Sequence, residues 1–206
     1  MKRNPGALRL LAGMCMCAGA IAMSPARQGA GTIVDPRDGK TYKTVTIGTQ
    51  TWMAENLAFK ACNGGCWPYE NKASNAAAYG YLYNWDAARK ACPSAWHLPA
   101  DAEWSKLVES LGGESAAGGK LKEAGAAHWA TPNTGATNES GFSALPGGGR
   151  SYDGKFSTIG RDGAWWSSTE DDAMSAWYRG LYNRISDAKR FRSIKANGYA
   201  VRCVKD

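Results

Sequence analysis

Residues 84–92 read NWDAARKAC and hold the clearest structural signal in this 206-residue chain. Asn84 is a residue type that caps helix N-termini, and Trp85, Ala88 and Cys92 follow with the i, i+3, i+7 spacing of one helical face. Pro93 cannot continue a helix. The sequence therefore predicts a helix over residues 85–92 that turns Cys92 toward the protein interior.

The N-terminus has the pattern of an export signal. Three basic residues precede an apolar run that is too short to span a membrane and ends in an A-x-A cleavage pattern. We predict a signal peptide over residues 1–22, cleaved after Ala22 or Ala26, and a small-residue linker over residues 23–31. A lipid anchor on Cys15 or Cys17 is the alternative, but a methionine precedes each where a small residue is typical. The protein is expected to be secreted or on the cell surface, with a periplasmic or lipid-anchored location left open.

Cleavage of the signal changes the charge balance. The chain has 25 Lys and Arg and 18 Asp and Glu, a net charge of +7, and loss of three basic residues leaves 22 − 18 = +4. This charge is too small and too scattered to indicate a nucleic-acid partner. With 44% hydrophobic residues and 25 glycines, the composition is typical of one loop-rich domain, here residues 32–206, and unlike collagen, a coiled coil or a multi-span membrane protein.

Four cysteines remain after cleavage, in an exported and therefore oxidising setting. Cys62 and Cys66 enclose Asn-Gly-Gly, a loop flexible enough for a local bridge, which leaves Cys92 to pair with Cys203. Zinc held by Cys62, Cys66 and a histidine is the alternative, but the C-x3-C spacing is loose and no paired-histidine motif is present. We expect two disulfides, no metal and no cofactor.

Periodicity predicts the other elements. Residues 40–47 alternate like a half-buried strand, and a turn leads to a second strand at 50–53, with Trp52 as a core anchor. A second main helix is predicted over 101–111 and a marginal third over 119–124, after which turn residues dominate. Further strands are predicted at 79–83, 165–168, 176–182, 189–194 and 199–204. The fold class is α+β, with two main helices packed on short antiparallel strands and a long loop region.

Five ordered motifs resemble the Fibrobacter succinogenes major paralogous domain family. They are GTQTWMAENL at 48–57, WHLP at 96–99 followed by Glu103-Trp104, GFSALPGG at 141–148, WWSSTE at 165–170 and VRCVKD at 201–206. The resemblance covers about residues 33–206. It implies no particular reaction.

A more distant resemblance concerns the fold. Residues 85–92 are similar to the first helix of C-type lectin-like domains. In those domains a cysteine of this helix forms a disulfide with a cysteine of the final strand, and Cys203 has the corresponding place here. Residues 98–104 and 201–203 also resemble the formylglycine-generating, sulfatase-modifying relatives of that fold. The E-P-N, Q-P-D and W-N-D patterns of calcium-dependent sugar binding are absent. In loops, residues with side-chain oxygens more often form turns than bind calcium. The candidate oxygen ligands for calcium are Asn133, Asn138, Glu139 and Asp153.

The sequence offers no assembled catalytic set. Formylglycine generation needs two late cysteines, whereas Cys203 is the only one after Cys92. His97 and His128 are too few for a histidine-ligated iron site, and His97 is more typical of a hydrogen-bonded structural residue. No G-x-S-x-G motif occurs, and no glycosidase pair of carboxylates can be identified. We therefore predict that the protein is not an enzyme.

Aromatic and polar side chains gather between about residues 128 and 170. Trp165 and Trp166 are adjacent in a predicted strand, so we expect one inside and one outside, with Trp166 exposed. Aromatic stacking and hydrogen bonding suit carbohydrate or protein surfaces. A basic segment over residues 179–192 is expected to be a solvated hairpin face and not an anion site.

We predict a non-catalytic module that binds glycans or other cell-surface or cell-wall components. An uncharacterised enzyme on a formylglycine-generating scaffold, or a structural surface protein without a small ligand, is the alternative. The predicted partner is a glycan or a surface protein, with no nucleic acid and no membrane span. The predicted ligand-binding residues are Asn138, Glu139, Arg150, Tyr152 and Trp166.

Overall fold

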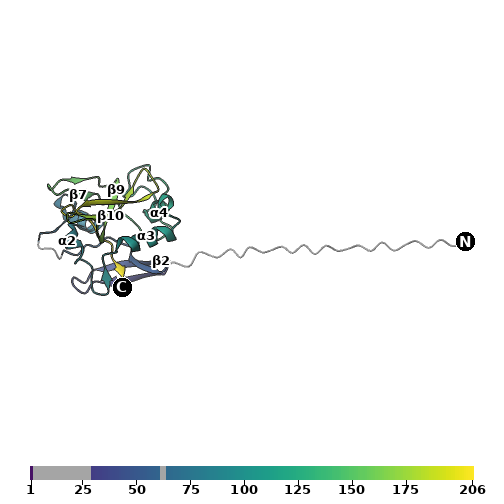
Figure 1. Ribbon diagram of the computed structural model, residues 1–206, viewed down its shortest axis with the longest axis horizontal. Helices are drawn as coiled ribbons and strands as arrows, with labels where there is room; N and C mark the ends of the chain where they lie inside the picture. The colour runs from purple at the N-terminus through teal and green to yellow at the C-terminus, as the bar shows by residue number, and fades with distance from the viewer. Residues whose placement is uncertain (2–28, 61–63) are drawn as a thin grey trace.

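The computed structural model describes Met1, residues 29–60 and residues 64–206 (Figure 1). These residues form a mixed α+β domain with three sheets and four α-helices. The predicted signal peptide lies outside the described residues apart from Met1. Strand β1, Ala30–Val34, starts inside the predicted linker because it pairs antiparallel with β2, Thr41–Ile47. No helix among the described residues is both long and apolar enough to cross a membrane.

The first sheet brings together distant parts of the chain in the order β1-β2-β3-β13-β6. Strand β13, Val204–Lys205, pairs with β3, Gln50–Met53, on one side and with β6, Trp96–His97, on the other. The prediction of a half-buried strand over residues 40–47 is confirmed for the first part of β2, where Thr41 and Lys43 are exposed, and is wrong from Thr44 on, where both faces are covered. Tyr42 is fully buried on one face and Val45 is buried on the other.

The second sheet has the order β11-β10-β9-β12-β5-β4. Its strands are β4 Cys66–Trp67, β5 Leu82–Tyr83, β9 Asp162–Glu170, β10 Ser175–Tyr182, β11 Ala188–Ile194 and β12 Tyr199–Ala200. The predicted strand over 199–204 is in fact divided between two sheets, since β12 belongs here and β13 to the first sheet. A third, two-stranded sheet pairs β7, Gly149–Arg150, with β8, Phe156–Ser157.

The predicted N-cap at Asn84 is confirmed, since its side chain accepts a hydrogen bond from the Ala87 amide. Helix α2, Trp85–Ala88, is shorter than predicted. The next amides, of Lys90 and Ala91, donate to the carbonyl three residues earlier, so the chain continues in 3-10-type turns. The second predicted helix is confirmed as α3, Asp101–Ser110. Helix α1, Ala73–Tyr79, and a 3-10 turn over Tyr69–Asn71 were not predicted.

Helix α4 lies at Glu114–Leu121, ahead of the predicted 119–124 segment. Gly118 sits inside this helix despite its low helix propensity. A Cβ atom at this position would collide with the carbonyl oxygen of Asp187. The glycine therefore allows α4 to lie close to the segment that enters β11, and packing overrides propensity.

Two buried clusters fill the domain and meet at β9. Helix α3 lies between the first sheet and β9 and β10 (Figure 1), and Trp104 of α3 joins Trp52 and Trp165 in one cluster. Trp166 belongs to the other cluster, so both faces of β9 are covered. The prediction of Trp52 as a core anchor is confirmed, and the predicted exposure of Trp166 is wrong, since Trp165 is 1% and Trp166 0% exposed.

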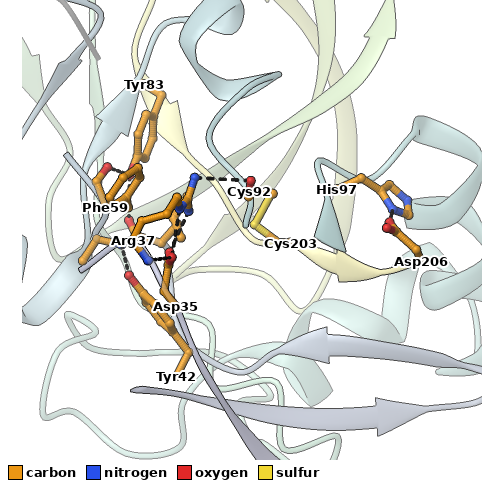
Figure 2. The surroundings of a disulfide bond; sticks show 11 residues. Asp35, Arg37, Tyr42, Phe59, Tyr83, Cys92, His97, Cys203 and Asp206 are labelled. Atoms are coloured by element: carbon orange, nitrogen blue, oxygen red, sulfur yellow. Dashed lines mark hydrogen bonds and ion pairs between the residues drawn. A yellow bond between two sulfur atoms is a disulfide. The ribbon is translucent and has the colours of Figure 1, made fainter. Parts of the chain in front are cut away.

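The predicted Cys92–Cys203 disulfide is confirmed and spans 111 residues of sequence (Figure 2). Beside it, Arg37 pairs with the buried carboxylate of Asp35 at 2.6 Å and lies over the Phe59 ring at 3.7 Å. The same guanidinium donates to the Cys92 carbonyl at 3.4 Å. The expected partner of Cys66, Cys62, lies outside the described residues.

Arg202 is fully buried next to the disulfide and connects several of the family-like motifs. Its guanidinium donates to Asn56 Oδ1 at 2.8 Å and to the Phe142 carbonyl, and it lies 4.2 Å from the Phe142 ring centroid. The Trp165 indole donates to the same Asn56 oxygen at 2.8 Å. Burial lowers the pKa of Arg202 to about 9. The motifs around residues 56, 142, 165 and 202 thus meet in one buried network.

Candidate functional site

A pocket of about 230 Å³ opens beside the third sheet, against β9, β10 and β12. Residues from five separate segments line it. They are Gly148, Gly149, Arg150, Ser151, Ser157, Thr158, Asp162, Gly163, Ala164, Tyr178, Tyr182, Asn197 and Tyr199.

Three half-buried tyrosines form the aromatic wall of the pocket. Tyr178 and Tyr182 lie on the same face of β10, since side chains alternate along a strand, and Tyr199 comes from β12. The Tyr178 and Tyr199 ring centroids are 4.6 Å apart. Gly180 leaves room for this arrangement, because a Cβ atom there would lie 2.8 Å from the Tyr182 hydroxyl oxygen. Burial raises the pKa of Tyr182 to about 12 and that of Tyr178 further, so both hydroxyls stay protonated donors.

Trp166 supports this wall from behind and does not reach the solvent. Its ring centroid lies 4.8 Å from that of Tyr199 and 6.3 Å from that of Tyr178. Its indole nitrogen donates to the Tyr83 carbonyl at 2.7 Å. Trp166 is therefore a packing residue of the site, and a ligand would meet the tyrosines in front of it.

Two charged side chains border the tyrosines. The Arg150 guanidinium stacks on Trp67 at 3.9 Å, and within the described residues its buried Nε has no hydrogen-bond partner. Asp162 lies on β9, opposite Tyr182 of β10, and burial raises the pKa of its carboxyl group. The backbone of Arg150 exchanges two hydrogen bonds with Gly198, at 2.9 and 2.7 Å, which holds Arg150 against the Asn197–Tyr199 wall.

A second pocket, of about 420 Å³, adjoins the first. The two share Thr158, Asp162 and Tyr182 as a common wall. The second pocket adds residues from the segments that flank the β9–β10 pair: Arg161, Asn183, Arg184 and Ile185.

The structure brings together only part of the predicted ligand-binding set. Arg150 lines the first pocket, and Tyr152 is 70% exposed beside it, with its backbone amide bonded to Asn197 Oδ1 at 2.9 Å. Asn138 and Glu139 lie elsewhere: Asn138 holds a turn with Ser143, and Glu139 pairs with Lys120 at 2.9 Å. These two residues line none of the pockets described here.

The residues considered for metals are also dispersed. Asn133 and Asn138 have positive φ angles in loop turns, and Asp153 pairs with Lys155 at 2.9 Å. Across residues 29–60 and 64–206, no three His, Cys, Asp or Glu side chains gather to hold a metal ion.

Both histidines pair with carboxylates outside the pockets. His97 contacts Asp206 at 2.6 Å and Glu103 at 2.9 Å, as Figure 2 shows in part. His128 contacts Glu123 at 2.8 Å. The prediction that His97 is a hydrogen-bonded residue is confirmed.

Sequence reasoning missed the tyrosines, Asp162 and Asn197. One signal was present, because Tyr178, Gly180 and Tyr182 alternate along a single strand and so place two aromatic rings around a gap on one face. No comparable pattern indicates Asp162 or Asn197, whose positions depend on tertiary packing.

Comparison with known proteins identifies a family. No curated protein and no solved structure matches the chain. Residues 45–205 match the Fibrobacter succinogenes major domain, and this segment contains both pockets, the disulfide and Arg202. Because the match covers most of the sequence, the chain belongs to the Fibrobacter succinogenes major domain family.

Proposed function

We propose that this domain is an exported, non-catalytic module that binds glycans. The observation that carries the proposal is the wall of Tyr178, Tyr182 and Tyr199, bordered by Arg150 and Asp162. A sugar ring has an apolar C–H face and an equatorial belt of hydroxyls, so it needs an aromatic surface and nearby polar groups at once. Ligand sites typically combine apolar walls with a few converging polar groups.

Asp162 gives the proposal a second support. Its pKa is raised by burial, so its ionised form is held at a cost in stability. Titratable groups with perturbed pKa values in a pocket are more frequent at functional sites than elsewhere. The carboxylate is an acceptor for sugar hydroxyls.

The non-catalytic part of the proposal follows from what lines the first pocket. Asp162 is the one carboxylate side chain among the described lining residues. Glycoside hydrolysis ordinarily uses two carboxyl groups on either side of the bond. The two histidines are engaged with carboxylates away from the pocket.

We also propose that the fold is C-type lectin-like. Three features support this: β13 completes the first sheet beside β3, the Cys92–Cys203 bridge joins the α2 region to the C-terminal segment, and a long loop region lies between α4 and β9. The disulfide also supports export, since such bridges persist in oxidising compartments. The site proposed here is assembled from the loop region together with β9, β10 and β12.

The test is a glycan and cell-wall polysaccharide array with the oxidised protein. We expect binding to at least one glycan class, and its loss in Tyr182→Leu and Asp162→Asn. Tyr81→Leu is the matched control, since Tyr81 is a half-buried tyrosine that does not line the pockets. Thermal melts and near-ultraviolet circular dichroism confirm that each variant is folded. Absence of glycan binding by the wild type, or unchanged binding by both folded pocket variants, would refute the proposal.

A further inference from the structure

None of the three arginines that line the two pockets forms an ion pair within the described residues. Arg37, Arg179, Arg190 and Arg192 each pair with an aspartate. Arg150, Arg161 and Arg184, in contrast, form no ion pair within the described residues, although all three line a pocket. Arginines that line a concave surface without an ion pair favour an anionic partner, because a guanidinium group has planar donors that match carboxylate and sulfate oxygens.

The two pockets adjoin and share a wall at Asp162 and Tyr182, and they are together called the groove below. These two residues face each other in the β9–β10 ladder. The aromatic wall is on one side of them, and Arg161 and Arg184 are on the other. Three cationic groups thus line the groove beside one carboxylate, so the groove has a net positive charge.

The arginine side of the groove is fixed in place by buried hydrogen bonds. The Asn183 amide donates to the Arg161 carbonyl at 2.9 Å, which places the segments that carry Arg161 and Arg184 side by side. The buried Lys122 ammonium donates to the carbonyls of Tyr182 and Ile185, each at 2.9 Å. The backbone of a rim held in this way loses little conformational entropy when a ligand binds.

We infer that the groove binds an acidic polysaccharide, with a sugar ring on the tyrosines and the anionic group of a neighbouring residue on Arg161 and Arg184. The inference rests on the proposed function and names its ligand class. Adjoining aromatic and cationic pockets fit a polymer that alternates rings and anionic groups better than a single neutral sugar. It also gives Arg184 a role that differs from the solvated hairpin face predicted for residues 179–192.

The test compares one polymer in two charge states. Polygalacturonate and its methyl ester have the same sugar, and only the former carries carboxylates. Affinity electrophoresis with the two polymers therefore isolates the contribution of charge to binding. It is run at 0.15 M salt, roughly physiological. We expect the acid to bind roughly tenfold or more tightly than the ester. The Arg161→Gln, Arg184→Gln double variant is expected to bind both forms equally. Comparing the binding of dextran sulfate with that of neutral dextran shows whether sulfate groups strengthen binding as carboxylates are expected to do.

The control removes the same charge elsewhere. Lys189→Gln, Arg192→Gln has the same net charge as the groove variant, and neither residue lines the groove. We expect this control to keep the preference for the acid. Equal binding of acid and ester by the wild type would refute the inference and leave the proposed function intact. Failure to bind either polymer, together with failure to bind any glycan on the array, would refute both the inference and the proposed function. Equal losses in the two double variants, or tighter binding of single-stranded DNA than of polygalacturonate, would show nonspecific attraction and overturn the inference.

Discussion

Two arginines define two contrasting regions of this domain. In the stapled region, which comprises the Cys92–Cys203 disulfide and Arg202 with its partners, the Arg202 guanidinium is fully buried and donates to Asn56 and to the Phe142 carbonyl. In the pocket region, which comprises the residues of the two pockets, Arg150 also stacks on an aromatic ring. Within the described residues, however, its side chain makes one hydrogen bond, at 3.4 Å to the Ser151 carbonyl.

The same residue type therefore has two different tasks. A buried charge needs hydrogen-bond partners in the protein, because an unsatisfied one is expensive, and the stapled region supplies them. At the pocket, Arg150 uses less of this capacity within the described residues, in keeping with the proposed binding role. The comparison predicts that substitutions in the stapled region change stability, and that substitutions in the pocket region change binding.

The largest effect is expected from loss of the disulfide. Its closed loop spans 111 residues, and a Cys92→Ala, Cys203→Ala variant should lose about 5 kcal/mol of unfolding free energy in the chain-entropy model. Urea denaturation monitored by tryptophan fluorescence measures the loss. If the variant were as stable as the wild type, the stapled region would not owe its stability to the bridge.

The next largest effect separates the two arginines directly. Arg202→Met leaves the Phe142 carbonyl without its buried donor and should cost about 3 kcal/mol of stability. Arg150→Met removes mainly a cation–π contact and should cost less than about 1 kcal/mol. Urea midpoints of the two variants test this, and glycan arrays should show the opposite order, with Arg150→Met losing binding. Equal destabilisation by the two substitutions would break the distinction.

Substitution of Asp162 is expected to have a smaller effect and to increase stability, whereas the substitutions above decrease it. Because burial raises the pKa of this carboxyl group, the folded protein keeps its proton to a higher pH than the unfolded chain does. Stability is therefore lost as the pH rises from the unfolded value toward the folded one. Asp162→Asn should unfold at a higher temperature than the wild type at pH 7, and the difference should shrink below pH 4. A lower melting temperature at pH 7 would mean that Asp162 is a stabilising residue.

The smallest effect concerns His97, which lies outside both regions and pairs with Asp206 and Glu103. Burial opposes its protonation, but hydrogen bonds to Asp206 and Glu103 outweigh burial and raise its pKa. Its contribution to stability is thus fully present below the unfolded value of 6.5 and is lost as the pH rises through the folded pKa. The melting temperature of His97→Gln should differ most from that of the wild type below pH 6 and least above pH 8. A pH-independent difference would show that protonation is not involved.

The sequence predicted the stapled region better than the pocket region, for physical reasons. The helix cap at Asn84, the spacing of Cys92 and the isolated position of Cys203 are local signals that survive without a structure. Trp166 was misplaced because strand alternation assumes one solvated face, whereas β9 is covered on both. The pocket itself could not be predicted, since it joins segments around residues 150, 162, 182 and 199 that have no common sequence pattern.

The position of β13 between β3 and β6 has a consequence for the order in which the domain folds. A chain that is made N-terminus first presents residues 50–53 and 96–97 long before residues 204–205 arrive. Until then, two strands of the first sheet have unpaired edges, and such edges favour aggregation. The domain thus depends on late-arriving residues to close its earliest sheet, and a holding chaperone acting during this interval would increase the yield of native protein.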